Sequence, residues 1–200
     1  MPKNAGLQPT IQALIDRATD HFSASVRRFK PWTVQNSITE RNLTFQLATA
    51  FLRHFPDGLA FMEVPFRFEA RTRADTHLDA YLFAKDLEIL LESKIVWAKD
   101  HIDAIRADMD RMSPQVLLQI QKRHREAGAS QARNTVAMIL AETWRPEIAQ
   151  FWCGEAVKRP RWSPDLLTRD GWTFGSKEVF REHDGTGGTL HWLWASKRLN

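Results

Sequence analysis

Three charged residues, Asp79, Glu92 and Lys94, occupy positions where a β-hairpin would bring them together. Two apolar runs of strand length, 78–84 and 87–96, are separated by a polar pair, which predicts antiparallel strands joined by a tight turn. If the residues that flank the turn pair with each other, Asp79 lies opposite Glu92. Side chains alternate along a strand, so Lys94 shares the face of Glu92. The hairpin therefore predicts two carboxylates and an ammonium group on one patch of sheet.

Such an arrangement suits phosphodiester cleavage. Directly opposed like charges destabilise a sheet, and a divalent cation between Asp79 and Glu92 would offset their repulsion. Hard oxygen ligands suit Mg²⁺, with Mn²⁺ as a substitute. The cation would stabilise charge on a phosphate and lower the pKa of its bound water, while Lys94 would orient that water or the developing oxyanion.

Asp79, twelve intervening residues and then Glu92-Ser93-Lys94 resemble the motif of the PD-(D/E)XK nuclease superfamily, although Leu78 stands where the motif has proline. The resemblance implies a restriction-endonuclease-like core of a helix, three strands, a helix and a further strand. It also implies that Asp79, Glu92 and the Ser93 carbonyl hold Mg²⁺. The expected substrate is DNA, and the expected product carries a 5′-phosphate.

Glu40 has two interpretations. A helix is predicted over 37–54, and the resemblance implies that a glutamate of the first core helix joins the metal site, a role that Glu40 would fill. Alternatively, Ser37-Ile38-Thr39-Glu40 is a capping box, in which Glu40 returns a hydrogen bond to the helix cap. The sequence leaves both open.

The remaining patterns predict an α/β fold with a central mixed sheet flanked by helices. A strand over 59–70 contains Pro65, which indicates an edge or a bulge. A buried strand over 135–142 follows a helical crossover, so it is expected to lie parallel to the Glu92 strand. We expect one domain comprising an N-terminal part (1–36), a nuclease-like core (37–142) and a C-terminal α+β elaboration (143–200). The other elements expected are helices over 11–22, 98–112, 113–127 and 146–157 and a hairpin over 177–196.

Basic residues are candidates for contact with a nucleic-acid backbone, because the chain has a formal net charge of +4. The alternative is a solvated charged surface. The connection after the first helix, 27–32, is basic and aromatic, whereas the acidic residues of the 98–112 helix are expected to be solvated. Trp192 and Trp194 share one strand face and are expected to pack against the core rather than stack on bases. The candidate contacts are Arg27, Arg28, Arg71, Arg73 and Lys99.

Several other chemistries are excluded by the sequence. Cys153 is the only cysteine, so there is no intramolecular disulfide and no cysteine-based zinc site. Serine-hydrolase, zinc-protease and dinucleotide-binding motifs are absent. No apolar leader or membrane-spanning run occurs, and a cytoplasmic protein is expected. A homodimer is possible, since cutting both strands of a duplex needs two sites.

The sequence thus predicts a Mg²⁺-dependent nuclease. One alternative is a catalytically inactive nuclease fold kept as a nucleic-acid-binding or assembly module. Another is a slipped hairpin register, in which Glu92, Ser93 and Lys94 form an ordinary surface triplet and Glu92 is exposed.

Overall fold

The computed structural model of the chain describes residues 6–29, 39–66, 76–112, 118–122, 126, 132–155, 170–181 and 188–199. Helices and strands are interspersed along these residues in an α/β arrangement. The helices are α1 (Leu7–Phe29), α2 (Glu40–His54), α3 (Lys99–Arg111) and α5 (Pro146–Trp152). The strands are β1 (Leu59–Phe66), β2 (Thr76–Phe83), β3 (Glu88–Ile95), β4 (Thr135–Thr143), β5 (Trp172–Arg181) and β6 (Thr189–Arg198).

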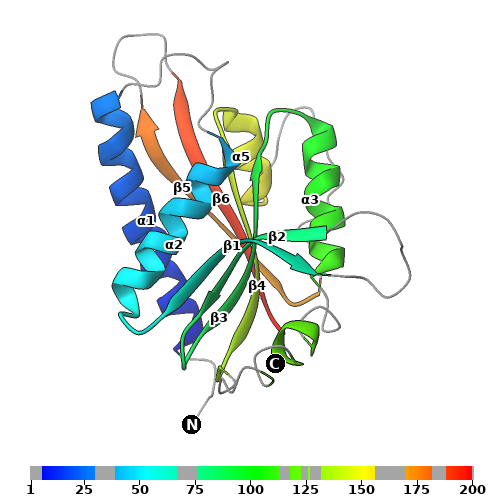
Figure 1. The fold of residues 1–200 in the computed structure, drawn as a ribbon. Coiled ribbons are helices and arrows are strands. Elements are labelled where there is room, and N and C mark those ends of the chain that lie inside the picture. Colours follow the sequence, from blue (N-terminus) through cyan, green and yellow to red (C-terminus); the bar gives the residue numbers. More distant parts are fainter. Residues whose placement is uncertain are drawn as a thin grey trace.

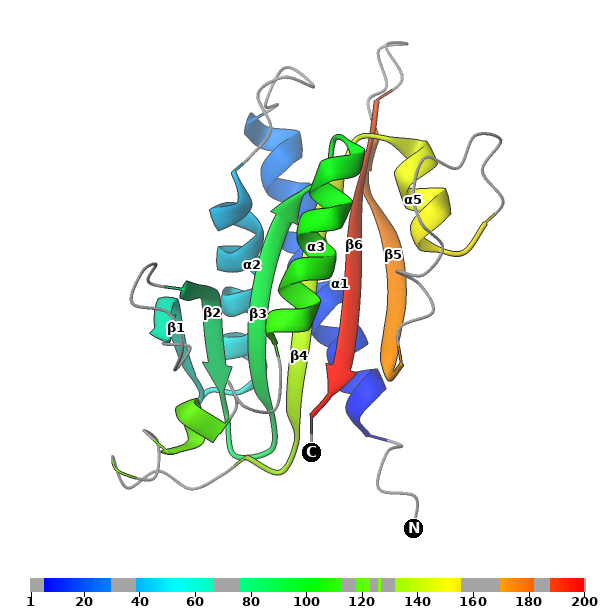
Figure 2. The ribbon, with the colours of Figure 1, turned by 90° about the vertical axis from the view of Figure 1, so that its right-hand side faces the viewer.

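A six-stranded mixed sheet, ordered β1-β2-β3-β4-β6-β5, forms the centre of the molecule. Helices α1 and α2 cover one face, and α3 and α5 cover the other (Figure 1). Figure 2, viewed from the α3 side, places β1 and β5 at the two edges of the sheet. Each face has its own apolar cluster, which we call the α1/α2 cluster and the α3/α5 cluster.

The predicted hairpin register is confirmed between β2 and β3. The backbone amides of Ala84 and Leu87 each donate to the other residue's carbonyl, closing the tight turn. From there the ladder pairs Phe83 with Glu88 and ends with Ala80 opposite Leu91. The slipped-register interpretation is therefore wrong.

The prediction for the strand after α3 is also confirmed. β4 is buried along its whole length and lies parallel to β3. On its other side, β6 pairs with it antiparallel and buries Trp192 and Trp194, as expected for core residues. Gly175 of β5 leaves room for the Trp194 indole, since a Cβ there would lie 2.3 Å from Trp194 Cζ2.

Two expectations about the N-terminal half need correction. The first helix is longer than its apolar stripe predicts, so Arg27 and Arg28 lie in the last turn of α1 rather than in a connection. The apolar alternation expected along the first strand is interrupted at Glu63, whose φ is 54°. As a result, Ala60 packs against the α1/α2 cluster, whereas Val64 packs against the α3/α5 cluster.

Helices α2, α3 and α5 lie within their predicted ranges but are shorter than predicted. α5 stops at Trp152, before the predicted end at 157, and the C-terminal hairpin begins earlier than predicted, at Trp172. Of the helix expected over 113–127, residues 118–122 and 126 are described, and all of them are helical. None of the described helices is long and apolar enough to cross a membrane.

Candidate active site

β2 and β3 separate at the residues predicted to do chemistry. Their ladder ends at Ala80 and Leu91. The structure therefore does not contain the expected ladder pair between Asp79 and Glu92. Instead, the Asp79 carboxylate accepts a hydrogen bond of 2.6 Å from the backbone N–H of Ser93. Leu78 packs against the α3/α5 cluster, whereas Ala80 packs against the α1/α2 cluster. The backbone therefore rotates at Asp79, which turns its carboxylate into the gap between the strands.

Glu92 is almost completely buried, at 3% exposure, and faces α3. Its pKa is raised to about 8, chiefly by burial and then by the nearby carboxylates of Asp79 and Asp108, whose effect on the pKa is larger than the opposite effect of Arg111 and Lys94. The pKa of Asp79 is raised as well, chiefly by burial. Removing the proton from either carboxyl group is therefore unfavourable unless a further positive charge lies beside it.

Lys94 lies on the same side as Glu92, as predicted, and its Nζ is 3.2 Å from Asp108 Oδ2. Burial by itself would lower the pKa of Lys94, but the carboxylates of Asp108, Glu40 and Glu92 together hold that pKa above its ordinary value. The side chain is therefore a fixed positive charge beside Glu92.

Glu40 points at the site rather than at its own helix cap. Its Oε1 accepts a 3.0 Å hydrogen bond from the backbone N–H of Ile95. Thr39 is the residue that caps α2, and its side chain makes no capping hydrogen bond; Ser37 lies outside the described residues. One turn along α2, Thr44 donates to the hydroxyl of the fully buried Ser93. These two contacts fix helix α2 to β3. The Glu40 carboxylate lies near Asp79 and Lys94.

The last turn of α3 completes the site with two residues that the sequence did not identify. Asp108 was expected on a solvated face, but it is buried, at 4% exposure, and is paired with Lys94 and Arg111. Arg111 also reaches Glu92, with 3.3 Å between Nη2 and Oε1. Helical spacing contained the signal, because Asp108 lies three residues after buried Ile105 and four before buried Met112.

Glu142 is a further buried carboxyl group that the sequence did not single out. It ends the apolar run of β4 and pairs in register with Ile95 on one side and Trp192 on the other. Neither of its oxygens, nor Trp192 Nε1, has a hydrogen-bond partner among the described residues. Burial raises its pKa to about 8, with a smaller contribution from the charge of Glu40.

The predicted nucleic-acid contacts are only partly visible. Arg71 and Arg73 lie outside the described residues, as does the side chain of Lys99 at the start of α3. Arg27 and Arg28 are exposed at the end of α1. That end of α1 lies at the same end of the sheet as the start of α2 (Figure 2).

The donors present are of the kind that a hard divalent cation prefers. Asp79 and Glu92 supply carboxyl groups whose raised pKa values a bound cation would lower, which is a chemical fit to such an ion. Within the described ranges, however, no three histidine, cysteine, aspartate or glutamate side chains are grouped so that they could hold a metal ion. A cation would therefore need backbone or water ligands, or a rearrangement of the carboxylates.

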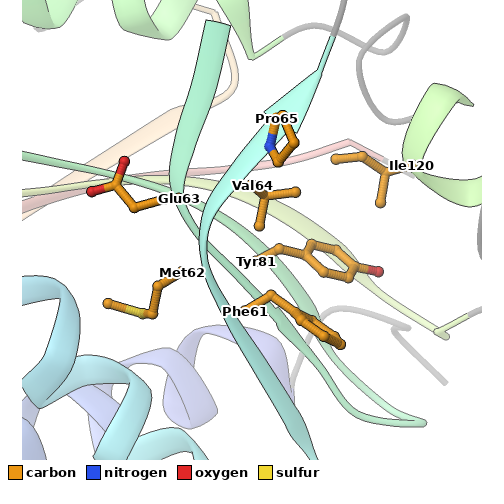
Figure 3. Close-up of a pocket in the computed structure, with 7 residues that line it drawn as sticks. All are labelled: Phe61, Met62, Glu63, Val64, Pro65, Tyr81 and Ile120. Atoms are coloured by element: carbon orange, nitrogen blue, oxygen red, sulfur yellow. The ribbon is translucent and has the colours of Figure 1, made fainter. Parts of the chain in front are cut away.

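A shallow hollow of about 230 Å³ lies along the edge strand β1. Figure 3 shows Phe61, Val64 and Tyr81 on one side of this strand and Glu63 pointing away from them. The lining is apolar except for Glu63 and Tyr81, and Glu63 forms a surface ion pair with Arg41. This hollow contains none of the predicted catalytic residues.

A comparison of the chain with family models, with curated proteins and with solved structures found no match.

Proposed function

We propose that this protein is a metal-dependent nuclease of the PD-(D/E)XK type that hydrolyses phosphodiester bonds, with DNA as the expected substrate. The main support is the meeting of Asp79, Glu92 and Lys94 where β2 and β3 separate, with Glu92 buried among other carboxylates. The order α2, β1, β2, β3, α3, β4 also agrees with the core that the resemblance implies.

Asp79 and Glu92 would hold Mg²⁺, together with the carbonyl of Ser93. When bound, the ion would lower the pKa of a coordinated water and stabilise negative charge on the phosphate. The protein already fixes one of these ligands, since Ser93 N–H orients the Asp79 carboxylate. The hydrogen bond from Ile95 likewise fixes Glu40 beside the same strand, where it could bind a metal-coordinated water.

Lys94 would act as an electrostatic group and not as a base. The surrounding carboxylates keep its pKa high, so it has no free lone pair to accept a proton near neutral pH. As an ammonium, it can donate a hydrogen bond to the attacking water or to the developing oxyanion in an in-line displacement. Asp108 would hold it in place for that role.

A catalytically inactive nuclease fold, acting as a nucleic-acid-binding or assembly module, is the second candidate. The observation that favours it is the salt bridge between Arg111 and Glu92, which gives Glu92 a permanent counter-ion if it does not open. In that case the site would need no metal ion.

A cleavage assay with a matched lysine control tests the proposal. Wild type, Lys94→Ala and Lys85→Ala would each be incubated with plasmid DNA, single-stranded DNA and RNA in Mg²⁺ or Mn²⁺. Lys85 lies on the same hairpin but is exposed at its turn. We expect Lys94→Ala to lose about 10²- to 10³-fold in rate while Lys85→Ala matches wild type. Equal rates for Lys94→Ala and wild type, with both folded by circular dichroism, would refute the mechanism.

A further inference from the structure

Helix α3 brings one cation and one anion to the candidate site from a single turn. Asp108 contacts Lys94, and Arg111 contacts both Asp108 and Glu92. Arg111 is therefore the cation bound to Glu92, the carboxylate proposed to hold a metal ion. Its part in metal binding depends on how firmly it holds Glu92.

The geometry of this contact is poor for an arginine and a carboxylate. Arginine binds a carboxylate best through two parallel N–H···O bonds at about 2.7 to 2.9 Å. Here the single nitrogen Nη2 serves both Glu92 and Asp108, and its distance to Glu92 is 3.3 Å. The Nε of Arg111 is buried and has no hydrogen-bond partner among the described residues. The guanidinium of Arg111 thus places a positive charge beside Glu92 but does not form the two parallel hydrogen bonds of a good arginine–carboxylate pair.

The charged groups around Glu92 are also unbalanced, with more carboxyl groups than cations. Three carboxyl groups, those of Glu92, Asp79 and Asp108, lie together here with only two cations among the described residues, Arg111 and Lys94. The carbonyl end of helix α3 adds further negative potential at this point. A divalent ion would offset more of this charge than one shared guanidinium does.

Arg111 also has a route out of the site. Its side chain is 36% exposed, whereas that of Glu92 is 3% exposed. The guanidinium can turn to water without unfolding any element, because it lies at the end of α3. Asp108 would keep its contact with Lys94 when Arg111 leaves.

We propose that Arg111 is a releasable counter-ion, which contacts Glu92 in the metal-free protein and leaves it when a divalent cation binds. The inference rests on the proposed function, because it assumes that Glu92 is a metal ligand. It assigns Arg111 a regulatory role: metal binding must break the contact between Arg111 and Glu92, so this contact lowers the affinity for metal.

Calorimetric titration with MnCl₂ tests this role in wild type, Arg111→Gln and Arg133→Gln. Arg133 is the control, since it forms an exposed ion pair with Asp86 near the hairpin turn. We expect Arg111→Gln to bind Mn²⁺ about tenfold more tightly than wild type, because no contact has to be broken first. Its thermal midpoint in EDTA should fall, since Glu92 and Asp108 lose a counter-ion. Arg133→Gln should match wild type in affinity.

The outcomes separate this inference from the proposed function. If wild type and Arg111→Gln bind Mn²⁺ equally and wild type cleaves DNA, the inference fails and the proposed function stands. If neither protein binds Mn²⁺, both fail.

A measurement on wild type covers the case in which Arg111→Gln does not fold. Phenylglyoxal modifies accessible arginines, and mass spectrometry reports the rate at the peptide that contains Arg111. We expect Mn²⁺ to accelerate modification of Arg111 and to leave Arg133 unaffected. An unchanged or slower rate at Arg111 would overturn the inference.

Discussion

Glu88 and Glu92 lie on the same strand, β3, and on the same face of the sheet, and both are almost completely buried. Their surroundings differ. Glu88 accepts hydrogen bonds from two neutral hydroxyl groups, 2.5 Å from Tyr81 and 2.8 Å from Thr135. Glu92 has no neutral hydroxyl donor among the residues that the structure describes and lies instead among charged groups, with Arg111 at 3.3 Å.

The difference indicates what each glutamate does. At Glu88 the strands β2 and β3 are paired, and neutral donors satisfy both carboxylate oxygens, which is an arrangement that stabilises the fold. At Glu92 the strands have separated, and burial together with two other carboxylates raises its pKa. Functional sites are where such unfavourable arrangements persist. We therefore interpret Glu88 as structural and Glu92 as functional.

Matched truncations should separate the two glutamates most strongly. Glu88→Ala leaves the Tyr81 and Thr135 hydroxyls buried without their acceptor, and we expect it to cost about 4 kcal/mol of unfolding free energy. Glu92→Ala removes repulsion as well as packing, so its cost in EDTA should be about 1 kcal/mol. Urea denaturation in EDTA measures both values. A cost for Glu92→Ala as large as that for Glu88→Ala would break the comparison.

Glu142 sharpens the comparison, because it is a buried glutamate with no hydrogen-bond partner among the described residues. Its pKa is raised to about 8 in the folded protein, so unfolding releases its proton at neutral pH. The contribution of Glu142 to the free energy of unfolding is therefore fully present below the unfolded pKa near 4.5. It is lost as the pH rises from there through the folded pKa of about 8.

We expect Glu142→Gln to be more stable than wild type at pH 9, by on the order of 3 kcal/mol, and nearly equal to it at pH 4.5. Denaturant titrations at several pH values measure this difference. Parallel stability curves for the two proteins would show that Glu142 does not titrate as its burial predicts.

Much of the framework around these residues could be predicted from the sequence. The hairpin register followed from two apolar runs and a two-residue turn, and the parallel placement of β4 followed from the helical crossover. Alternation alone could not show that the backbone rotates at Asp79. The neighbouring strand is irregular at the same level, at Glu63, between the ladder pairs Met62/Ala80 and Val64/Leu78. The sequence therefore identified Asp79 and Glu92 but placed them in a ladder that the structure does not continue.

The contributions of α3 and β4 were harder to predict. Asp108 was interpreted as solvated because acidic residues in helices usually are, and only its position relative to Ile105 and Met112 indicated burial. Arg111 could not be assigned to Glu92 without knowing how α3 packs on β3. Glu142 gave a weaker signal, as a charged residue near the end of a wholly buried strand.

The most direct test is the thermal midpoint with and without millimolar Mn²⁺ for wild type, Glu92→Gln and Glu88→Gln. An ion present at ten times its dissociation constant stabilises the native state by about 1.4 kcal/mol. This should raise the midpoint of a domain of this size by roughly 3 to 6 °C. We expect that rise in wild type and Glu88→Gln and its loss in Glu92→Gln. A rise that persists in Glu92→Gln, or none in wild type, would contradict the assignment of Glu92 as the metal-binding carboxylate.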